Sequence, residues 1–513
     1  MSEILFGQSY FLRFDQKLWQ AMQPYPPLGT LYALSYLRQK GYDTALFDAM
    51  LAGSEDEWEQ SLAQNKPAFA VLYEDNFNYL SKMCLLRMRQ ASFTMIEMAK
   101  KRGCTVILCG ADATDHAEDY LSRGADFILL GEGEATLAEL MDRLVGKTAT
   151  AFEDIAGLAY RVSGAVRRNN RRPDLRDLDS LPFPARDLLD MPRYRSLWME
   201  RHGYFSMNLV TTRGCPFHCN WCAKPIWGQR YNTRSPENVA AEMRQLKQQY
   251  QPDHVWFADD ILGLKPGWLE RFGDCVQAEN ASIPFKCLSR VDLLLRPHEV
   301  EALGRAGAQT VWVGAESGSQ KILDAMDKGT RVEQIYEARR RLKAAGIKAA
   351  FFLQFGYPGE TRADIEKTIQ MVRQAQPDDI GISVSYAMPG TKFYAAVREQ
   401  LGEKQNWQDS SDMAMLFHGS FSTAFYRKLH SVIHKEFRAR RAWQALTCAG
   451  EKALPQTLSS RARYVLRLIY NLATLPLARL QLNRLAKEPH NRSLAVPHMA
   501  PDAASRPTPQ DER

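Results

Sequence analysis

Residues 211–222 read TTRGCPFHCNWC and bring three cysteines close together, Cys215, Cys219 and Cys222. The stretch begins at the end of residues 206–211, which we predict to form a strand. Iron–sulfur clusters are held by thiolates, and a cubane cluster contains four irons. Three closely spaced cysteines can therefore bind three irons and leave the fourth coordinatively open. We predict a [4Fe–4S] site on this loop, with the three cysteines as its metal ligands.

Two other metal sites compete with this interpretation. A ferredoxin-type cluster would need a fourth cysteine nearby, and the next one in the sequence is the distant Cys275. Structural zinc also requires four ligands, which His218 could complete as a Cys3His site. That site would force His218 and its neighbour Cys219 onto one metal ion, which is geometrically awkward. A metal-binding scaffold without catalytic activity stays open as a different class of protein.

The composition restricts the class of protein further. A chain of 513 residues with 45% hydrophobic and 24% charged residues should form several globular domains. The net charge of +7 is modest, and the first 400 residues hold no basic stretch interleaved with aromatics, so we expect no nucleic-acid binding. Cysteines without disulfide-scaffold spacing and an amino terminus without a signal-peptide core predict a cytoplasmic location. No apolar run is long enough to span a membrane.

Around the cysteines, the sequence alternates between strand-like and helix-like segments. We assign residues 196–400 to a partial (β/α)6 barrel of the TIM type, whose active site should lie at the carboxyl ends of the strands. The six predicted strands are 206–211, 254–257, 285–288, 310–313, 349–354 and 380–384.

Residues 1–150 show the same alternation and predict a parallel, doubly wound α/β sheet of the Rossmann type. Ligands of such sheets bind outside the carboxyl ends of the strands. Residues 74–76, 110–112 and 131–134 follow three of the predicted strands. We further predict a connector at 151–195, a helical carboxyl-terminal region at 401–487 and a disordered tail at 488–513.

The spacing Cys-x-x-x-Cys-x-x-Cys, with Trp221 before the last cysteine, resembles the signature of radical S-adenosylmethionine (SAM) enzymes. The resemblance implies that the open iron binds the amino and carboxylate groups of SAM. It also implies that the reduced cluster cleaves SAM to a 5′-deoxyadenosyl radical, with electrons from an external donor such as flavodoxin or ferredoxin. Trp221 would pack near the adenine.

Other strand ends resemble the same family. Asp259 and Asp260 end the second barrel strand and are similar to the acidic motif that meets the amino group of SAM. Glu316, in the GAESG sequence after the fourth strand, resembles a stretch that lines the cofactor pocket. Residues 289–292 and 356–360 are further candidates. Each of these segments could equally be an ordinary turn that caps the next helix.

A Rossmann-like domain ahead of such a barrel resembles the cobalamin-binding subgroup of the family. The sequence PYPPLG at 24–29 and the glycine-containing strand ends support this resemblance, because glycine lets a backbone approach a large flat ring closely. The Asp-x-His-x-x-Gly motif is absent, so cobalamin would bind without a histidine ligand. Alternatively, the domain is degenerate and binds nothing. The predicted cobalamin-binding residues are Gly110, Asp112, Gly131, Glu132 and Gly133.

The carboxyl-terminal region is similar to the anaerobic magnesium-protoporphyrin monomethyl ester cyclase group, which includes relatives that methylate unactivated carbons. Tyr426, His430 and His434 recur there at helical spacing, which is also typical of a packed amphipathic helix. Residues 452–487 contain arginines but no acidic residue. Such a basic amphipathic stretch could rest on an anionic membrane surface.

The leading hypothesis is a cobalamin-dependent radical SAM methyltransferase that acts on an unactivated carbon of a small-molecule or lipophilic substrate. An anaerobic oxidative cyclase acting on a tetrapyrrole-like ring is the alternative enzyme. The sequence does not identify the substrate.

Overall fold

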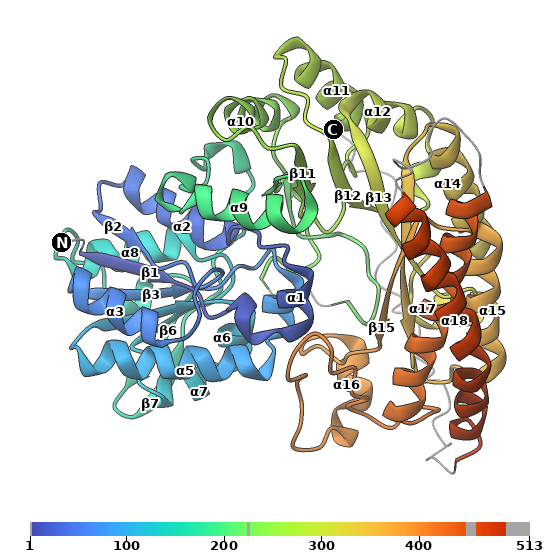
Figure 1. The fold of residues 1–513 in the computed structure, drawn as a ribbon. Helices are drawn as coiled ribbons and strands as arrows, with labels where there is room; N and C mark the ends of the chain where they lie inside the picture. The colour runs from blue at the N-terminus through green and yellow to red at the C-terminus, as the bar shows by residue number, and fades with distance from the viewer. Residues whose placement is uncertain (1–2, 223–225, 448–457, 489–513) are drawn as a thin grey trace, which may run out of the picture.

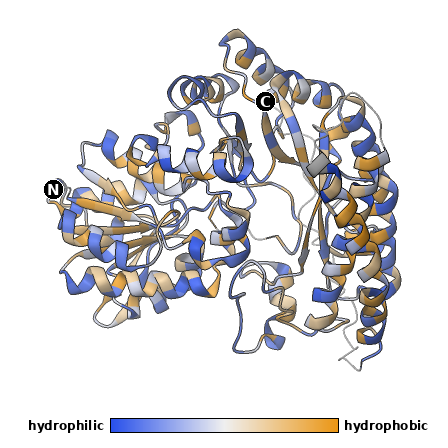
Figure 2. Ribbon diagram, in the orientation of Figure 1, coloured by the Kyte–Doolittle hydropathy of each residue, from blue (hydrophilic) through white to orange (hydrophobic). Residues whose placement is uncertain are grey.

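The computed structural model describes residues 3–222, 226–447 and 458–488. Two β-sheets lie side by side, each covered by helices (Figure 1). The amino-terminal sheet is blue to cyan, the second sheet is green to yellow, and two long orange and red helices flank the second sheet. Apolar residues concentrate on the strands of both sheets (Figure 2). This architecture confirms the predicted α/β fold with its Rossmann-like, half-barrel and helical parts.

The amino-terminal sheet has the order β2-β1-β3-β4-β5-β6-β7. Its first five strands are parallel, and β1 and β3 are buried along their whole length, as expected for strands with helices on both faces. Helices α2 and α8 pack on one face, and α3 and α5 pack on the other. The parallel strands are β1 (Ile4–Gly7), β2 (Thr44–Leu46), β3 (Phe69–Tyr73), β4 (Thr105–Cys109) and β5 (Phe127–Leu129). The helices are α1 (Gln16–Ala21), α2 (Leu28–Gln39), α3 (Asp56–Asn65), α4 (Tyr79–Met83), α5 (Leu86–Lys101), α6 (Ala111–Asp115), α7 (Ala117–Ser122) and α8 (Glu134–Leu144).

The segment 151–195 is more than the connector that we predicted. Strands β6 (Leu158–Val162) and β7 (Ala165–Arg168) form an antiparallel hairpin that extends the amino-terminal sheet beyond β5. The hairpin was not predicted from the sequence because β7 is short, basic and mostly exposed, and therefore shows no apolar pattern. Helix α9 (Met191–His202) then leads to the second sheet.

The second sheet contains six parallel strands in chain order, β8-β11-β12-β13-β14-β15, which is the predicted half-barrel. A two-stranded antiparallel ribbon, β9 with β10, flanks the cysteine segment in sequence. The strands are β8 (Ser206–Leu209), β9 (Thr212–Arg213), β10 (Asn232–Thr233), β11 (His254–Phe257), β12 (Phe285–Ser289), β13 (Ala308–Glu316), β14 (Lys348–Phe355) and β15 (Asp379–Val384). The helices are α10 (Pro236–Gln249), α11 (Trp268–Ala278), α12 (Glu299–Ala306), α13 (Gln320–Ala325), α14 (Val332–Ala344), α15 (Arg362–Ala375) and α16 (Lys392–Val397).

The carboxyl-terminal region is helical, as predicted. Helices α17 (Thr423–Thr447) and α18 (Leu458–Leu485) pack antiparallel, with Lys428 Nζ 2.7 Å from Gln481 Oε1 and Lys435 Nζ 2.6 Å from Thr474 Oγ1. One apolar core joins α17 to the half-barrel and to loops of the amino-terminal domain. Within the described ranges, no helix is both long enough and apolar enough to cross a bilayer. The tail predicted to be disordered lies outside the described residues, apart from its first position.

Candidate functional site

The cysteine loop lies at the carboxyl end of β8, the first strand of the half-barrel. Gly214 has φ +81°, and a Cβ there would clash with the backbone carbonyl of Arg230, so the turn into the loop requires glycine. Cys215 and Cys219 are buried, and Cys222 is half-buried. Three thiols therefore stand on one loop at the edge where active sites of this barrel type lie.

Two cations accompany the thiols. Arg290 Nη1 lies 3.9 Å from Cys219 Sγ, and its guanidinium stacks 3.6 Å from the Phe217 ring centre. Lys328 is buried and donates to Glu316 Oε1 at 2.9 Å. Burial alone would lower the pKa of Lys328, but the charges of Glu316 and Cys219 raise it, so its ammonium stays protonated.

This set of side chains fits an anionic iron–sulfur cluster. In the described part of the chain, no three His, Cys, Asp or Glu side chains are grouped to hold one metal ion in common. A cubane makes a different demand, because each thiolate binds its own iron. The charges of Arg290 and Lys328 would balance those of the thiolates, which are the ligating form of cysteine.

Asp259 has one oxygen that no described residue satisfies. Its Oδ1 accepts hydrogen bonds from Thr211 N at 2.8 Å and from Thr212 Oγ1 at 2.6 Å. Its Oδ2 is buried without a hydrogen-bond partner among the described residues. Burial raises the pKa of Asp259 to about 6, so the group is mainly ionised at neutral pH. A buried acceptor without a partner is rare and is suited to an external donor such as an ammonium group.

Asp260, its neighbour, has a different role. It is exposed and forms an ion pair of 2.9 Å with Lys82, which belongs to α4 of the amino-terminal domain. The structure thus separates the two adjacent aspartates that we predicted together. One is buried in the half-barrel, and the other joins the two sheets.

Glu316 and Trp221 are brought together around Lys328. Glu316 has φ +56°, a conformation that is costly for a residue with a Cβ, and it lies where the register between β13 and β14 shifts. Lys328 Nζ lies 6.0 Å from the Trp221 ring centre. Trp221 Nε1 is buried without a hydrogen-bond partner within the described residues. No local pattern marked Lys328, which lies in a short loop between α13 and α14.

The glycines at the carboxyl edge of the amino-terminal sheet permit close packing. A Cβ at Gly110 would approach the Glu74 side chain to 2.9 Å, and one at Gly133 would lie 2.6 Å from Cys109 Sγ. Gly131 has φ +80°, which favours glycine.

The two acidic residues predicted at this edge have partners within the chain. Asp112 receives hydrogen bonds from Arg89 Nε at 2.8 Å and from the Tyr120 hydroxyl at 2.6 Å, and it also contacts His116. Burial would raise the pKa of Asp112, but His116 and Arg89 hold it well below its usual range. Glu132 accepts from Arg213 Nη1 at 3.1 Å and from the Leu175 amide at 2.5 Å.

Unpartnered polar atoms lie close in sequence to these residues. Gln8 follows β1, Asn76 follows β3, and Thr114 lies in α6 after β4. Each has a buried side-chain nitrogen or oxygen with no hydrogen-bond partner in the described ranges. Because carboxyl ends of parallel strands meet at one edge, these atoms fit the polar groups of a ligand there. Gln8 and Thr114 were missed by sequence reasoning, since neither belongs to a recognisable motif.

Residues 209–372 match the family model of the Radical SAM superfamily. The chain carries a radical SAM domain. "Uncharacterized methyltransferase PH0819" of Pyrococcus horikoshii is 27% identical over 389 residues, covering 75% of this chain and 81% of that protein. The anaerobic magnesium-protoporphyrin IX monomethyl ester cyclase of Rubrivivax gelatinosus is 25% identical over 394 residues, covering 74% and 67%.

The fold is shared with a solved structure of the cobalamin-dependent SAM radical enzyme OxsB with aqua-cobalamin and SAM bound. The TM-score is 0.67 at 16% sequence identity, over 94% of this chain and 75% of that one. The match extends beyond the radical SAM domain and confirms the predicted combination of a Rossmann-like sheet with a half-barrel.

Tyr79 connects the radical SAM domain with the amino-terminal domain. It belongs to α4 of the amino-terminal domain, yet Cys222, Glu316 and Asp260 all influence its hydroxyl. Burial raises the pKa of Tyr79, although 48% of its surface remains accessible. No local pattern marked Tyr79 in the sequence.

The predicted carboxyl-terminal residues lie on α17. The rings of His430 and His434 are tilted by 58° with their centres 4.3 Å apart, and burial lowers their pKa values to about 4 and 3. Both are therefore neutral at pH 7. Tyr426 is buried in the apolar core, and its hydroxyl lacks a hydrogen-bond partner among the described residues. These features favour the packed amphipathic helix over direct catalysis.

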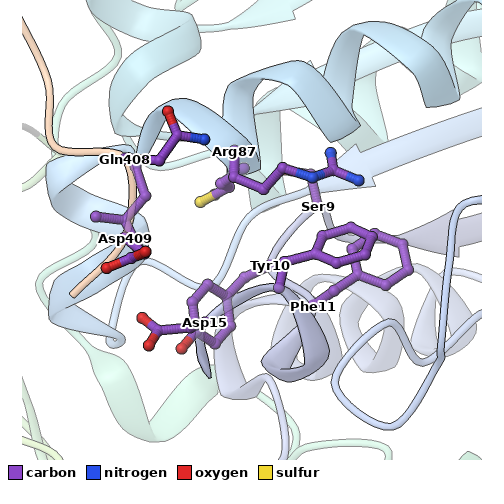
Figure 3. Close-up of a pocket in the computed structure, with 10 residues that line it drawn as sticks. Ser9, Tyr10, Phe11, Asp15, Arg87, Gln408 and Asp409 are labelled. Carbon is purple, nitrogen blue, oxygen red and sulfur yellow. The ribbon is translucent and has the colours of Figure 1, made fainter. Parts of the chain in front are cut away.

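A small recess lies elsewhere, where the amino-terminal domain meets the loop after α16. Figure 3 shows Arg87 and Asp15 on one side and Gln408 and Asp409 on the other. Ser410 Oγ donates to Asp15 Oδ1 at 2.8 Å and fastens the loop there. None of the predicted site residues lines this recess.

Proposed function

We propose that this chain is a cobalamin-dependent radical SAM enzyme that methylates an unactivated carbon of a small-molecule or lipophilic substrate. The observation that carries the proposal is the grouping of Cys219, Glu316 and Trp221 around the buried cation Lys328, at the carboxyl end of the half-barrel. The methyltransferase name of the Pyrococcus relative and the cobalamin bound in OxsB support the reaction and the cofactor.

Each group at the mouth of the half-barrel has a distinct task in this proposal. Cys215, Cys219 and Cys222 hold the cluster, and Arg290 and Lys328 compensate its charge. When bound, the cluster and SAM together supply the 5′-deoxyadenosyl radical, and cobalamin supplies the methyl group. The unpaired Oδ2 of Asp259 accepts from the amino group of SAM, and Trp221 packs on its adenine.

The amino-terminal edge would receive cobalamin. Gly110, Gly131 and Gly133 allow the backbone to lie close to the ring. Asp112 and Glu132 would support this edge without contacting the ring through their carboxylates, because Arg89 and Arg213 already bind those carboxylates. The unpaired atoms of Gln8, Asn76 and Thr114 supply polar contacts. Tyr79 lies between this edge and the cluster.

Anaerobic reconstitution with iron and sulfide tests the proposal. We expect cluster absorption, reductive cleavage of SAM and, after incubation with a cobalamin, corrinoid absorption that stays with the protein. Replacing Cys215, Cys219 and Cys222 with Ala should abolish the cluster, whereas Cys275→Ala in α11 should retain it. Cluster absorption in the triple variant, or uncleaved SAM with an intact reduced cluster, would refute the enzyme and leave a metal-binding scaffold.

An oxidative cyclase acting on a tetrapyrrole-like ring is the second candidate, favoured by the similarity to the Rubrivivax cyclase. The product mass distinguishes the two reactions, since methylation adds one carbon and oxidative cyclisation adds none.

Either reaction needs an external electron donor, for which we propose a flavodoxin or ferredoxin. Exposure to oxidants would convert the thiols to disulfides, so we also propose a cytoplasmic location.

We further propose that α18 rests on an anionic membrane surface. Leu466, Ile469, Leu477 and Leu480 are each about three-fifths exposed or more, at 59–67%. They lie opposite Leu482, which is buried against the rest of the protein. At about 100° per residue, arginines fall on both edges of this apolar face. They are Arg461 and Arg479 on one edge, and Arg463 and Arg467 on the other. Arg479 also pairs with Glu436 of α17 at 2.7 Å, and Arg484 falls within the apolar face near its carboxyl end.

This arrangement is complementary to anionic lipid, because leucines can enter the acyl boundary while arginines reach the headgroups. A second copy of the chain fits less well, since a twofold contact would bring the arginines of two α18 helices together and residues 458–485 include no acidic residue. The apolar residues continue along α18 in Figure 2.

Vesicle co-sedimentation tests the contact, using phosphatidylcholine with and without phosphatidylserine. We expect binding to the anionic vesicles and at least a roughly tenfold loss in the double variant Leu466→Ser, Leu477→Ser. Met199→Ser, at an exposed apolar position of α9, is the matched control. Equal binding by the double variant would overturn the proposal, as would a dimer of the wild-type protein that only the double variant loses.

A further inference from the structure

The inner face of the half-barrel is open. Along the central strand β13, Val311 and Val313 point to the outer helices and are buried, whereas Thr310 and Trp312 point inward and remain partly exposed. Strand β12 repeats the alternation, and on β14 Phe352 is 37% exposed while Ala350 and Gln354 on the same face are buried. Inward side chains of central strands are normally covered, so this face is shaped to receive a ligand.

The exposed part of this face is aromatic. Trp312 and Phe352 stack with ring centres 4.6 Å apart at an interplanar angle of 28°. Gly381 on β15 adjoins them, and a Cβ there would lie 3.1 Å from the Phe352 ring. The small residue therefore keeps the rings accessible. Flat aromatic surfaces of this kind favour another flat ring placed against them.

One cation lies further toward the amino ends of the strands. Lys286 on β12 points inward, beside Thr310 in the register of the sheet. Its Nζ lies 5.3 Å from the ring centres of both Tyr25 and Trp256. Among the described residues, Lys286 forms no hydrogen bond or ion pair. A largely enclosed ammonium without a counter-ion is suited to an anionic ligand.

Two other titratable groups act on Lys286. Burial lowers the pKa of His254 to about 4, so this imidazole is neutral at pH 7. Asp379 on β15 contributes a negative charge but forms no ion pair with the lysine. Burial lowers the pKa of Lys286 to about 8, which leaves the ammonium mostly protonated at pH 7.

We propose that the inner face binds a planar, conjugated substrate that carries a carboxylate, with its ring on Trp312 and Phe352 and its carboxylate on Lys286. The inference rests on the proposed function, whose substrate class it names. Arg290, which contacts Cys219, lies four positions after Lys286, and four extended steps span about 13 Å. A substrate anchored at Lys286 must therefore be on the order of 10 Å long to reach the cluster. A fused-ring acid has this length, and a single amino acid does not.

Calorimetric titration of the reconstituted protein with anthracene-2-carboxylate tests this inference. The uncharged counterpart is 2-hydroxymethylanthracene. We expect the wild type to bind the acid at least about tenfold more tightly than the alcohol. Lys286→Met should remove this preference and leave the affinity for the alcohol within about twofold. Lys286→Arg should retain it. Lys343→Met, on the outer helix α14, is the control for general loss of charge.

The aromatic contribution is tested by Trp312→Ala, which should weaken both compounds by a similar factor. Near-ultraviolet circular dichroism and cluster content verify that each variant is folded. Equal affinity of the wild type for acid and alcohol, or an unchanged preference in Lys286→Met, would overturn the inference. The readout does not depend on SAM cleavage. Protein that prefers the acid but leaves SAM intact would refute the proposed function alone, and the reverse result would refute this inference alone.

Discussion

Arg213→Met removes the guanidinium that binds two buried carboxylates where the amino-terminal domain meets the cysteine loop. Arg213 Nη1 lies 3.1 Å from Glu132, and Nη2 lies 2.6 Å from Glu134. The three side chains are 4%, 7% and 8% exposed, so solvent cannot replace the lost partner. Breaking a buried pair of this kind costs about 3–5 kcal/mol. We expect about 3 kcal/mol here, because the carboxylates can take up protons once the arginine is gone.

Urea unfolding followed by tryptophan fluorescence measures this cost. Since the chain has several domains, the first transition is the one to compare. Arg38→Met is the control, because Arg38 and Asp187 form an exposed pair that should contribute at most about 1 kcal/mol. Replacing both glutamates with Gln in the Arg213→Met background should restore most of the loss. The reasoning is refuted if Arg213→Met costs no more than Arg38→Met, or if the glutamine substitutions restore nothing.

The pH dependence of this variant follows from the same charges. Burial already raises the pKa of Glu132 in the presence of Arg213, and removal of the arginine raises it further. A carboxyl whose folded-state pKa lies above its unfolded value stabilises the fold at low pH and loses that contribution as the pH rises. The deficit of Arg213→Met should therefore be smaller at pH 5 than at pH 8.

Three further predictions concern single buried groups. In equilibrium dialysis, Asp259→Asn should weaken SAM binding about tenfold or more with the cluster retained, whereas Asp260→Asn should have little effect. The affinity of the wild type for SAM should fall as the pH drops through about 6, where Asp259 takes up a proton. Glu360→Gln should leave stability unchanged near pH 5 and raise it by up to roughly 4 kcal/mol near pH 9. Burial raises the pKa of Glu360 to about 8 in the folded protein. The wild type therefore loses stability as the pH rises from the unfolded-state pKa of this carboxyl to its folded-state pKa. A pH-independent difference in urea unfolding would contradict this. Tyr426→Phe should be neutral or stabilise by about 1 kcal/mol, because the hydroxyl is buried without a partner among the described residues; a loss above that amount would show an interaction that we have missed.

Local patterns were sufficient to predict the strands. The half-barrel strands are short apolar runs between turn residues, and β11 was predicted with its observed ends. The β6–β7 hairpin was missed because half of it is exposed and charged, so burial leaves no periodic pattern in the sequence. The grouping of the three cysteines could be predicted for a related reason, because they lie close together in the sequence, between Cys215 and Cys222.

Long-range pairing was beyond the sequence. Acidic residues at strand ends suggested ligand contacts, but Asp112 binds Arg89 and Glu132 binds Arg213, which lies 81 positions away. Arg290, which was a candidate from its place after β12, contacts Cys219 Sγ, whereas Lys328 comes from a loop between two helices and belongs to no motif. Which carboxylate meets a ligand and which meets an arginine depends on the three-dimensional contacts, and residue type alone does not decide it.

The atoms left unpaired by folding indicate where the cofactors belong. More than nine-tenths of buried polar groups in proteins find a partner, so each exception needs a cause. Asn76 and Thr114 follow strands of the amino-terminal sheet, and Asp259 follows a strand of the half-barrel. The ion pair of Lys82 with Asp260 and the ion pair of Arg213 with Glu132 both connect the same two domains. Ligands bound at both edges would satisfy these atoms at once. If so, loading the protein with both SAM and cobalamin should raise the stability of the domain junction by more than the sum of the increments that each ligand gives alone. Purely additive increments would show that the two sites are independent.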